Sequence, residues 1–162
     1  MLIKTSAAAL LSAMAFSALA ADTVPGEQAE KNGFSACQKT VENLAKFVVK
    51  SNNHSSLSTW NKKATDTRLF NAQVVINYPD GAAVSILNVA PTKGGKCDSA
   101  YTTITSFEKS CAVLRETMFS DWKFSTELGG LLVLENKSGS VNIILLPAAN
   151  GCTSIKSEVA YE

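Results

Sequence analysis

Residues 97–111 read Cys-Asp-Ser-Ala-Tyr-Thr-Thr-Ile-Thr-Ser-Phe-Glu-Lys-Ser-Cys, and this stretch decides the fold. Its first part, Cys97 to Phe107, alternates as a β-strand does, which places every second side chain on one face. Its last residue, Cys111, stands at the front of a helical pattern. A strand that opens with one cysteine is therefore followed directly by a helix that opens with another.

The two other cysteines of the chain repeat this arrangement. Cys37 stands at the front of a helical pattern, and Cys152 follows a glycine-containing loop and opens a strand pattern. The order along the chain is thus helix-Cys, strand-Cys, helix-Cys, strand-Cys. Four cysteines allow three pairings. A duplicated unit would repeat its own bridge, so we predict the disulfides Cys37–Cys97 and Cys111–Cys152, each stabilising the fold by roughly 4 kcal/mol.

The two tryptophans support an internal repeat of residues 34–107 and 108–162. Trp60 and Trp122 each precede two apolar runs that flank a tight turn. Further strand patterns cover residues 69–78, 82–90, 122–128, 131–135, 141–146 and 152–161, and the runs 131–135 and 141–146 are apolar enough to be buried on both faces. Residues 51–67 fit either a strand around Trp60 or a loop.

These patterns predict a two-layer α+β fold. It would consist of two tandem helix-plus-antiparallel-sheet units, each about αββββ, which share or abut their sheets and are joined by the disulfides. Residues 34–162 would form a single compact domain.

The N-terminus has the features of a cleaved signal peptide over residues 1–20. Lys4 precedes an apolar run from Ala7 to Leu19, which ends in Ala18-Leu19-Ala20. The run is shorter than the ~20 apolar residues that span a bilayer. We therefore expect a periplasmic or secreted protein without a transmembrane segment in the mature chain. Residues 21–33 are polar and contain Pro25, Gly26 and Gly33, so we predict a flexible leader there.

Composition excludes several classes of protein. The chain has 162 residues, 15 of them basic and 14 acidic, and 46% are hydrophobic, which excludes a disordered chain. The small net charge excludes a strongly basic nucleic-acid-binding protein. The chain holds a single histidine and no CxxC, phosphate-loop or calcium-loop motif. We expect no cofactor, no metal and no nucleic-acid partner.

Catalytic groups are sparse. His54 lies in the polar stretch Ser51-Asn-Asn-His-Ser-Ser56, where we expect an exposed loop, and no G-x-S-x-G motif accompanies it. A small hydrolase that uses His54 remains an alternative, for which Ser and Asp side chains would have to converge on the imidazole.

Binding of another exported or envelope protein is the function that we expect by elimination, as in inhibitors and immunity factors. Aromatic side chains on the uncovered face of the sheet could anchor such a partner: Trp60, Tyr78, Tyr101 and Trp122. Alternatively, both tryptophans pack between helix and sheet. Short polar residues would share the uncovered face, according to register: Ser85, Asn77, Thr102, Thr103, Thr105, Ser125, Asn142 and Ser154.

A tandem of helix-plus-four-strand units resembles the architecture of the secreted β-lactamase inhibitory proteins, which hold an enzyme on a concave sheet. This resemblance implies a protein-binding sheet and carries over no individual residues. A third alternative is a cell-envelope assembly or ligand-carrier protein, which would need a wide apolar cavity between helices and sheet.

Overall fold

The computed structural model describes residues 22–162, and the predicted signal peptide lies outside these residues. The described chain forms an α+β fold, as predicted. Its elements follow in this order: α1 Val24–Lys31, α2 Gln38–Val49, β1 Asn53–Thr59, the short 3-10 helix η1 Thr65–Thr67, β2 Phe70–Tyr78, β3 Gly81–Pro91, β4 Cys97–Phe107, α3 Cys111–Thr117, β5 Lys123–Leu128, β6 Leu131–Glu135, β7 Val141–Ala148 and β8 Gly151–Ala160.

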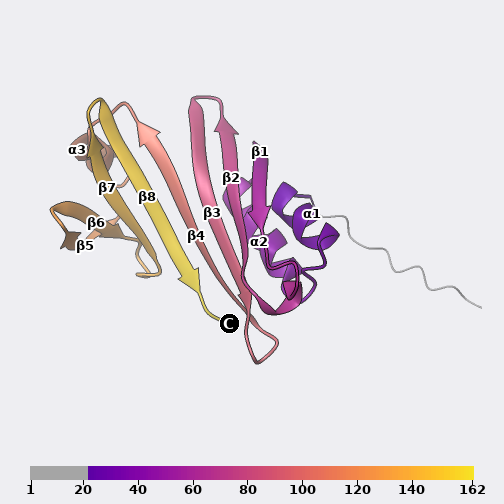
Figure 1. The fold of residues 1–162 in the computed structure, drawn as a ribbon. Coiled ribbons are helices and arrows are strands. Elements are labelled where there is room, and N and C mark those ends of the chain that lie inside the picture. The colour runs from indigo at the N-terminus through magenta and orange to yellow at the C-terminus, as the bar shows by residue number, and fades with distance from the viewer. Residues whose placement is uncertain (1–21) are drawn as a thin grey trace, which may run out of the picture.

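All eight strands belong to one antiparallel sheet in the order β1-β2-β3-β4-β8-β7-β6-β5 (Figure 1). The first four strands form a meander, and so do the last four. The two meanders meet where β4 pairs with β8, with Ile104 opposite Ile155. The last strand of each meander therefore lies in the middle of the sheet, and the first strands, β1 and β5, are its edges.

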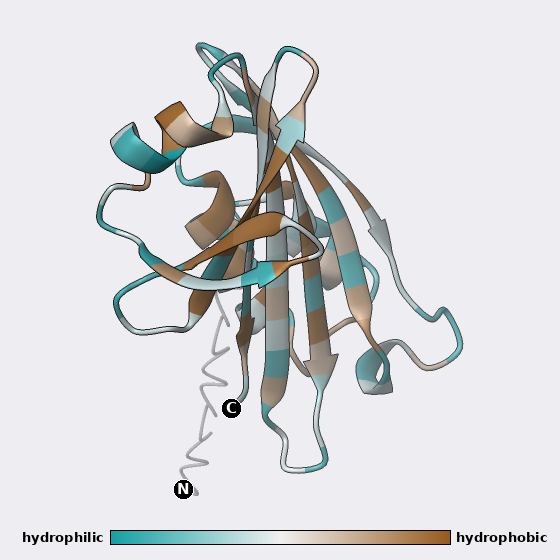
Figure 2. Ribbon diagram, turned by 90° about the vertical axis from the view of Figure 1, so that its left-hand side faces the viewer, coloured by the Kyte–Doolittle hydropathy of each residue, from teal (hydrophilic) through white to brown (hydrophobic). Residues whose placement is uncertain are grey.

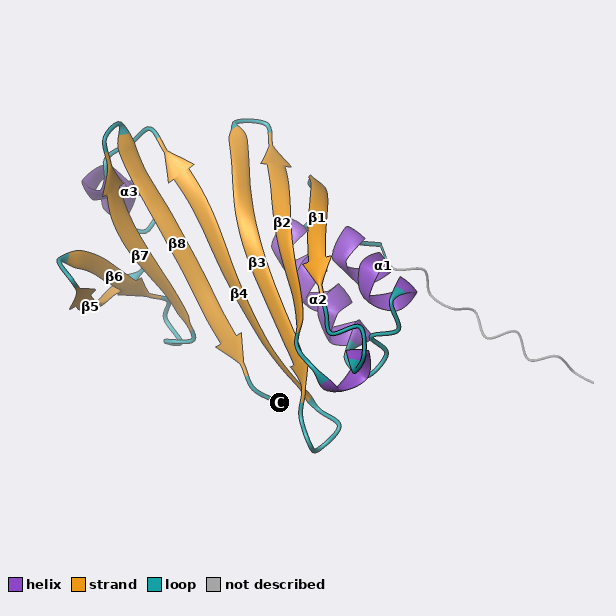
Figure 3. Ribbon diagram, in the orientation of Figure 1, coloured by secondary structure: helices purple, strands orange, loops and turns teal. Residues whose placement is uncertain are grey.

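The helices lie on one face of this sheet (Figure 3). Disulfides join Cys37 to Cys97 and Cys111 to Cys152, which are the two predicted pairs. They fix the start of α2 to the start of β4 and the start of α3 to the start of β8. The buried side chains form two clusters, one beneath α1 and α2 and a smaller one beneath α3.

The strands follow from alternation along the sequence. In β2 the side chains of Phe70, Ala72, Val74 and Ile76 are buried on the helix side, while the residues between them are more exposed. β5 and β6 are joined by Gly129-Gly130, both with positive φ (58° and 83°). That conformation favours glycine and gives the tight turn that a two-residue hairpin requires.

The prediction of a flexible leader over residues 21–33 is wrong, because α1 occupies most of this segment. Thr23 caps the helix by accepting a hydrogen bond from the Gly26 amide (3.2 Å), and Ala29 is completely buried. Glu42 of α2 holds the helix start: it accepts hydrogen bonds from the Asp22 amide (3.0 Å) and the Thr23 hydroxyl (2.7 Å). Lys46 adds an ion pair to Glu42 (3.2 Å). The helix is thus fixed by partners about twenty residues away.

Residues 51–67, which fit either a strand or a loop in the sequence, contain strand β1. His54 lies in this strand and not in the loop that we expected. Trp60 follows the strand, and its ring stacks on Phe70 with centroids 6.5 Å apart.

Candidate functional site

The face of the sheet opposite the helices is uncovered, and we call it the open face (Figures 1 and 3). Alternation along the strands separates the side chains of the two faces, and Figure 2 shows it as bands of different hydropathy. In β2 the open-face residues are Asn71, Gln73, Val75 and Asn77, because the residues between them point into the core. The registers of the other strands define the rest of the face.

A row of β-branched apolar side chains crosses the open face at right angles to the strands. Each member lies directly opposite the next across six consecutive strands. We call this set the central row: Val75, Val84, Ile104, Ile155, Ile144 and Val133. Because directly opposed side chains in a sheet are in contact, the row is one continuous apolar stripe.

Much of the central row is accessible to solvent. Val75 and Val84 are 42% and 39% exposed, the three isoleucines are partly exposed, and Val133 is buried. Val159 and Leu146 add further exposed apolar surface on the same face. A contiguous apolar patch of this kind marks an interaction surface more often than scattered exposed residues do.

The rows beside the central row mix apolar residues such as Ile86 and Leu146 with polar, mostly uncharged ones. The next row contains Thr102 opposite Ser157, and Ser157 opposite Asn142. Among the described residues, the open-face positions of β2, β3, β8 and β7 carry no charged side chain. This composition suits a flat contact made of apolar packing and neutral hydrogen bonds.

The polar residues expected on the uncovered face divide between the two faces. Thr102, Asn77 and Asn142 lie on the open face, as their register requires. Ser85 and Ser154 are buried on the helix side, and Thr103 and Thr105 are on that side too. The Ser85 and Thr103 hydroxyls are 2.6 Å apart and hydrogen-bonded, which satisfies both polar groups beneath the helices.

The four aromatic residues considered as anchors lie on the helix side and not on the open face. Trp60 packs on the first core cluster, and Trp122 packs edge-on against Phe119 with centroids 6.0 Å apart. Both tryptophans therefore take the alternative position between helix and sheet. This position is favourable because the large tryptophan rings remove more apolar surface from water than smaller side chains do.

Tyr101 and Tyr78 are also on the helix side. Tyr101 is 4% exposed, and its ring contacts Phe47 with centroids 5.6 Å apart. Its hydroxyl is buried and finds no hydrogen-bond partner among the described residues. Burial raises the pKa of Tyr101 to about 12, and the nearby Glu158 carboxylate adds to the increase through its charge and through a hydrogen-bonding interaction that lies outside normal hydrogen-bond geometry. Tyr78 lines a surface groove.

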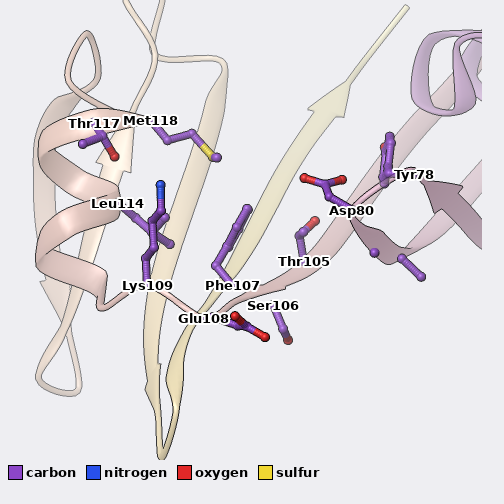
Figure 4. A pocket seen from close by; sticks show the side chains of 12 residues that line it. Tyr78, Asp80, Thr105, Ser106, Phe107, Glu108, Lys109, Leu114, Thr117 and Met118 are labelled. Atoms are coloured by element: carbon purple, nitrogen blue, oxygen red, sulfur yellow. The ribbon is translucent and has the colours of Figure 1, made fainter.

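That groove lies between α3 and the turn that joins β2 to β3, and it has a volume of about 590 Å³ (Figure 4). Leu114 and Met118 form one wall, and Tyr78 and Asp80 stand on the opposite side. Glu108 and Lys109 add charged groups to the lining. The groove is therefore of mixed polarity, whereas a ligand carrier would need a wide apolar cavity. A second pocket of about 180 Å³ lies beside Phe47 and Tyr101.

His54 is held by backbone groups. Its Nε2 accepts a hydrogen bond from the Val24 amide (3.2 Å), and its Nδ1 lies 3.0 Å from the Asn52 carbonyl oxygen, to which it donates. With both ring nitrogens engaged, the imidazole has no free lone pair to accept a proton from a serine. In the described structure neither ring nitrogen of His54 is hydrogen-bonded to a serine or aspartate side chain.

Within residues 22–162 no helix is long and apolar enough to cross a membrane. The comparisons with known proteins found no matching family model, no matching curated protein and no matching solved structure. The resemblance to the architecture of the β-lactamase inhibitory proteins therefore stays an expectation.

Proposed function

We propose that this chain is an exported, non-enzymatic protein-binding module that holds its partner on the open face. The central row carries the proposal: six apolar side chains lie directly opposite one another across the sheet, and all of them except the buried Val133 are exposed or partly exposed on the face away from the helices. The partner would be another exported or envelope protein, in the manner of an inhibitor or immunity factor.

Signal processing over residues 1–20 would deliver the chain to the periplasm or the exterior. The two disulfides support such a compartment, because disulfides persist in oxidising environments. They also cross-link the helices to the sheet on the side away from the open face, which favours a rigid binding surface. A rigid surface loses little conformational entropy on binding.

The proposal includes a tandem duplication of residues 34–107 and 108–162. Three features support it: each part contains a helix followed by a four-stranded meander, each holds its own disulfide, and the strand order is the same when read from either edge to the middle. Fusion through β4 and β8 would then have built one wide face from two narrow ones.

A matched pair of substitutions tests the binding face. Val84→Lys places a charge in the central row, and Val113→Lys places the same charge on α3, on the other side of the molecule. The two valines have similar exposure, 39% and 43%. Tagged mature chains would be used to capture partners from the envelope fraction of the source cell, after circular dichroism has shown both variants folded.

We expect one stoichiometric protein to bind the wild type and the Val113→Lys chain and to be lost from Val84→Lys. A partner that both variants retain, or that only Val113→Lys loses, would contradict the open face as the site. Turnover of any substrate that disappears in His54→Ala would contradict a non-enzymatic function.

A further inference from the structure

The central row and its two ends have a palindromic order. Across the sheet from β1 to β5 the directly opposed residues run Ser55, Val75, Val84, Ile104, Ile155, Ile144, Val133 and Thr126. Isoleucines meet in the middle, valines lie farther out, and a hydroxyl residue ends the row on each side. The open face therefore has an approximate twofold axis between Ile104 and Ile155, perpendicular to the sheet.

Two copies of such a face do not repel each other. The open-face positions of β2, β3, β7 and β8 carry no charged side chain, and β4 carries one, Asp98, near its start. Removal of residues 1–20 takes away Lys4 and leaves 14 basic and 14 acidic residues, so the mature chain has no net charge. Association of identical neutral surfaces meets no long-range barrier, and a net charge near zero favours it.

The face also has the size of a stable interface. With ~4.8 Å between strands and ~3.4 Å per residue, eight strands and about seven residues along each give roughly 34 Å by 24 Å, or at most about 800 Å². Two such faces would bury about 1,600 Å² in total, which is the standard size for a specific protein complex.

We propose that the open face of one copy packs against the open face of a second copy. The two sheets would stack about 10 Å apart, in the manner of a β-sandwich, with their central rows crossing where Ile104 and Ile155 of each copy meet. The twofold axis that relates the two copies would lie in the plane between the sheets. Such an arrangement is isologous, so each copy buries the same residues.

This inference rests on the proposed function, because it concerns the same face. The homodimer is the resting form, and the exported partner displaces the second copy. Dimerisation would shield the central row from water and from unrelated proteins until the partner arrives. Partner binding and self-association are then mutually exclusive.

Sedimentation of the mature chain, residues 21–162, from about 1 to about 500 µM tests the dimer. The variants are Thr102→Arg, which adds a charge beside the centre of the row, and Thr117→Arg, which adds the same charge to an exposed position of α3. Thermal unfolding checks that both are folded. In a face-to-face dimer of Thr102→Arg the two introduced guanidinium groups would both lie near the centre of the interface, where like charges oppose association.

We expect the wild type and Thr117→Arg to dimerise with concentration, and Thr102→Arg to raise the dissociation constant by at least about tenfold. Added salt should leave the wild-type dimer unchanged or strengthen it, because the contact is apolar. A wild-type chain that is monomeric at every concentration would overturn this inference, and so would a dimer indifferent to Thr102→Arg. Either result leaves the capture experiment with Val84→Lys as the separate test of the proposed function.

Discussion

Replacing Tyr101 by phenylalanine should stabilise the protein. The Tyr101 hydroxyl is buried without a hydrogen-bond partner among the described residues, and such a group costs about 1–3 kcal/mol. The substitution keeps the ring contact with Phe47 and the position of Lys156 Nζ, 5.7 Å from the ring centroid. We expect the free energy of unfolding to rise by about 1 kcal/mol, which corresponds to roughly 4 °C in Tm.

The same substitution should change the response to alkaline pH. The pKa of Tyr101 is about 12 in the folded protein, whereas an unfolded tyrosine titrates near pH 10. Between these values the unfolded chain loses the proton and the folded chain keeps it, so stability that is fully present below pH 10 is lost as the pH rises toward 12. Tyr101→Phe lacks this loss, and its advantage over the wild type should widen from pH 9 to pH 11.

Urea unfolding followed by tryptophan fluorescence at pH 7, 9 and 11 measures both effects. The matched control is Tyr161→Phe, because Tyr161 is 80% exposed and its hydroxyl is free to reach water. We expect that control to stay within about 0.5 kcal/mol of the wild type. A loss of about 1 kcal/mol or more in Tyr101→Phe would contradict this prediction. It would mean that the hydroxyl is hydrogen-bonded in solution, with the Glu158 side chain as the neighbouring acceptor.

Three other predictions follow from the packing. Gly26→Ala should destabilise the protein by about 1 kcal/mol, because an added Cβ would lie 1.7 Å from Glu42 Oε2 and would push this carboxylate away from the Asp22 amide and the Thr23 hydroxyl, and hydrogen exchange of the α1 amides should rise. Removing either disulfide by paired Cys→Ala substitution should lower the free energy of unfolding in urea by about 4 kcal/mol, since the bridges close loops of 60 and 41 residues. A variant as stable as the wild type would contradict this prediction. Hydrogen bonds from the Ser35 hydroxyl and the Ala36 amide lower the pKa of Asp66. The free energy of unfolding should therefore be highest above about pH 4 and decrease on further acidification, and in Asp66→Asn this decrease should be smaller.

The strands and the disulfides could be predicted because their signals are local. Alternation over a few residues identifies each strand, and the glycine pair at residues 129–130 identifies its hairpin. The pairing of Cys37 with Cys97, and of Cys111 with Cys152, followed from the repeated order of cysteines along the chain. None of these inferences required knowledge of which segments meet across the fold.

α1 was missed, and β1 was left open between a strand and a loop, because the polar groups of each segment are satisfied by the other. The helix-side residues of β1 include His54 and Ser58, which give no apolar alternation, and they bond to Val24 and Gln28 of α1. Gln28 also donates to the Ser56 carbonyl oxygen (3.1 Å) along the sheet edge. Each segment alone has the composition of a polar loop, and the two form a helix and a strand because they bind each other. The sequence of either segment therefore does not predict this contact.

The sequence predicted an uncovered face but not the apolar central row on it, for a different reason. Strands β6 and β7 are apolar on both faces, and this pattern predicts burial on both. Within the described chain the helices cover only one side, where Leu134 and Ile143 are buried, while Ile144 on the other side is still partly exposed. Residues such as Ile144, which the pattern predicts to be buried but which one chain leaves partly exposed, therefore belong to the surface that we propose binds a partner. A single copy cannot cover all of its apolar side chains, and a second protein packed on the open face would cover the rest. The sedimentation and capture experiments decide whether that protein is a second copy, a partner, or each in turn.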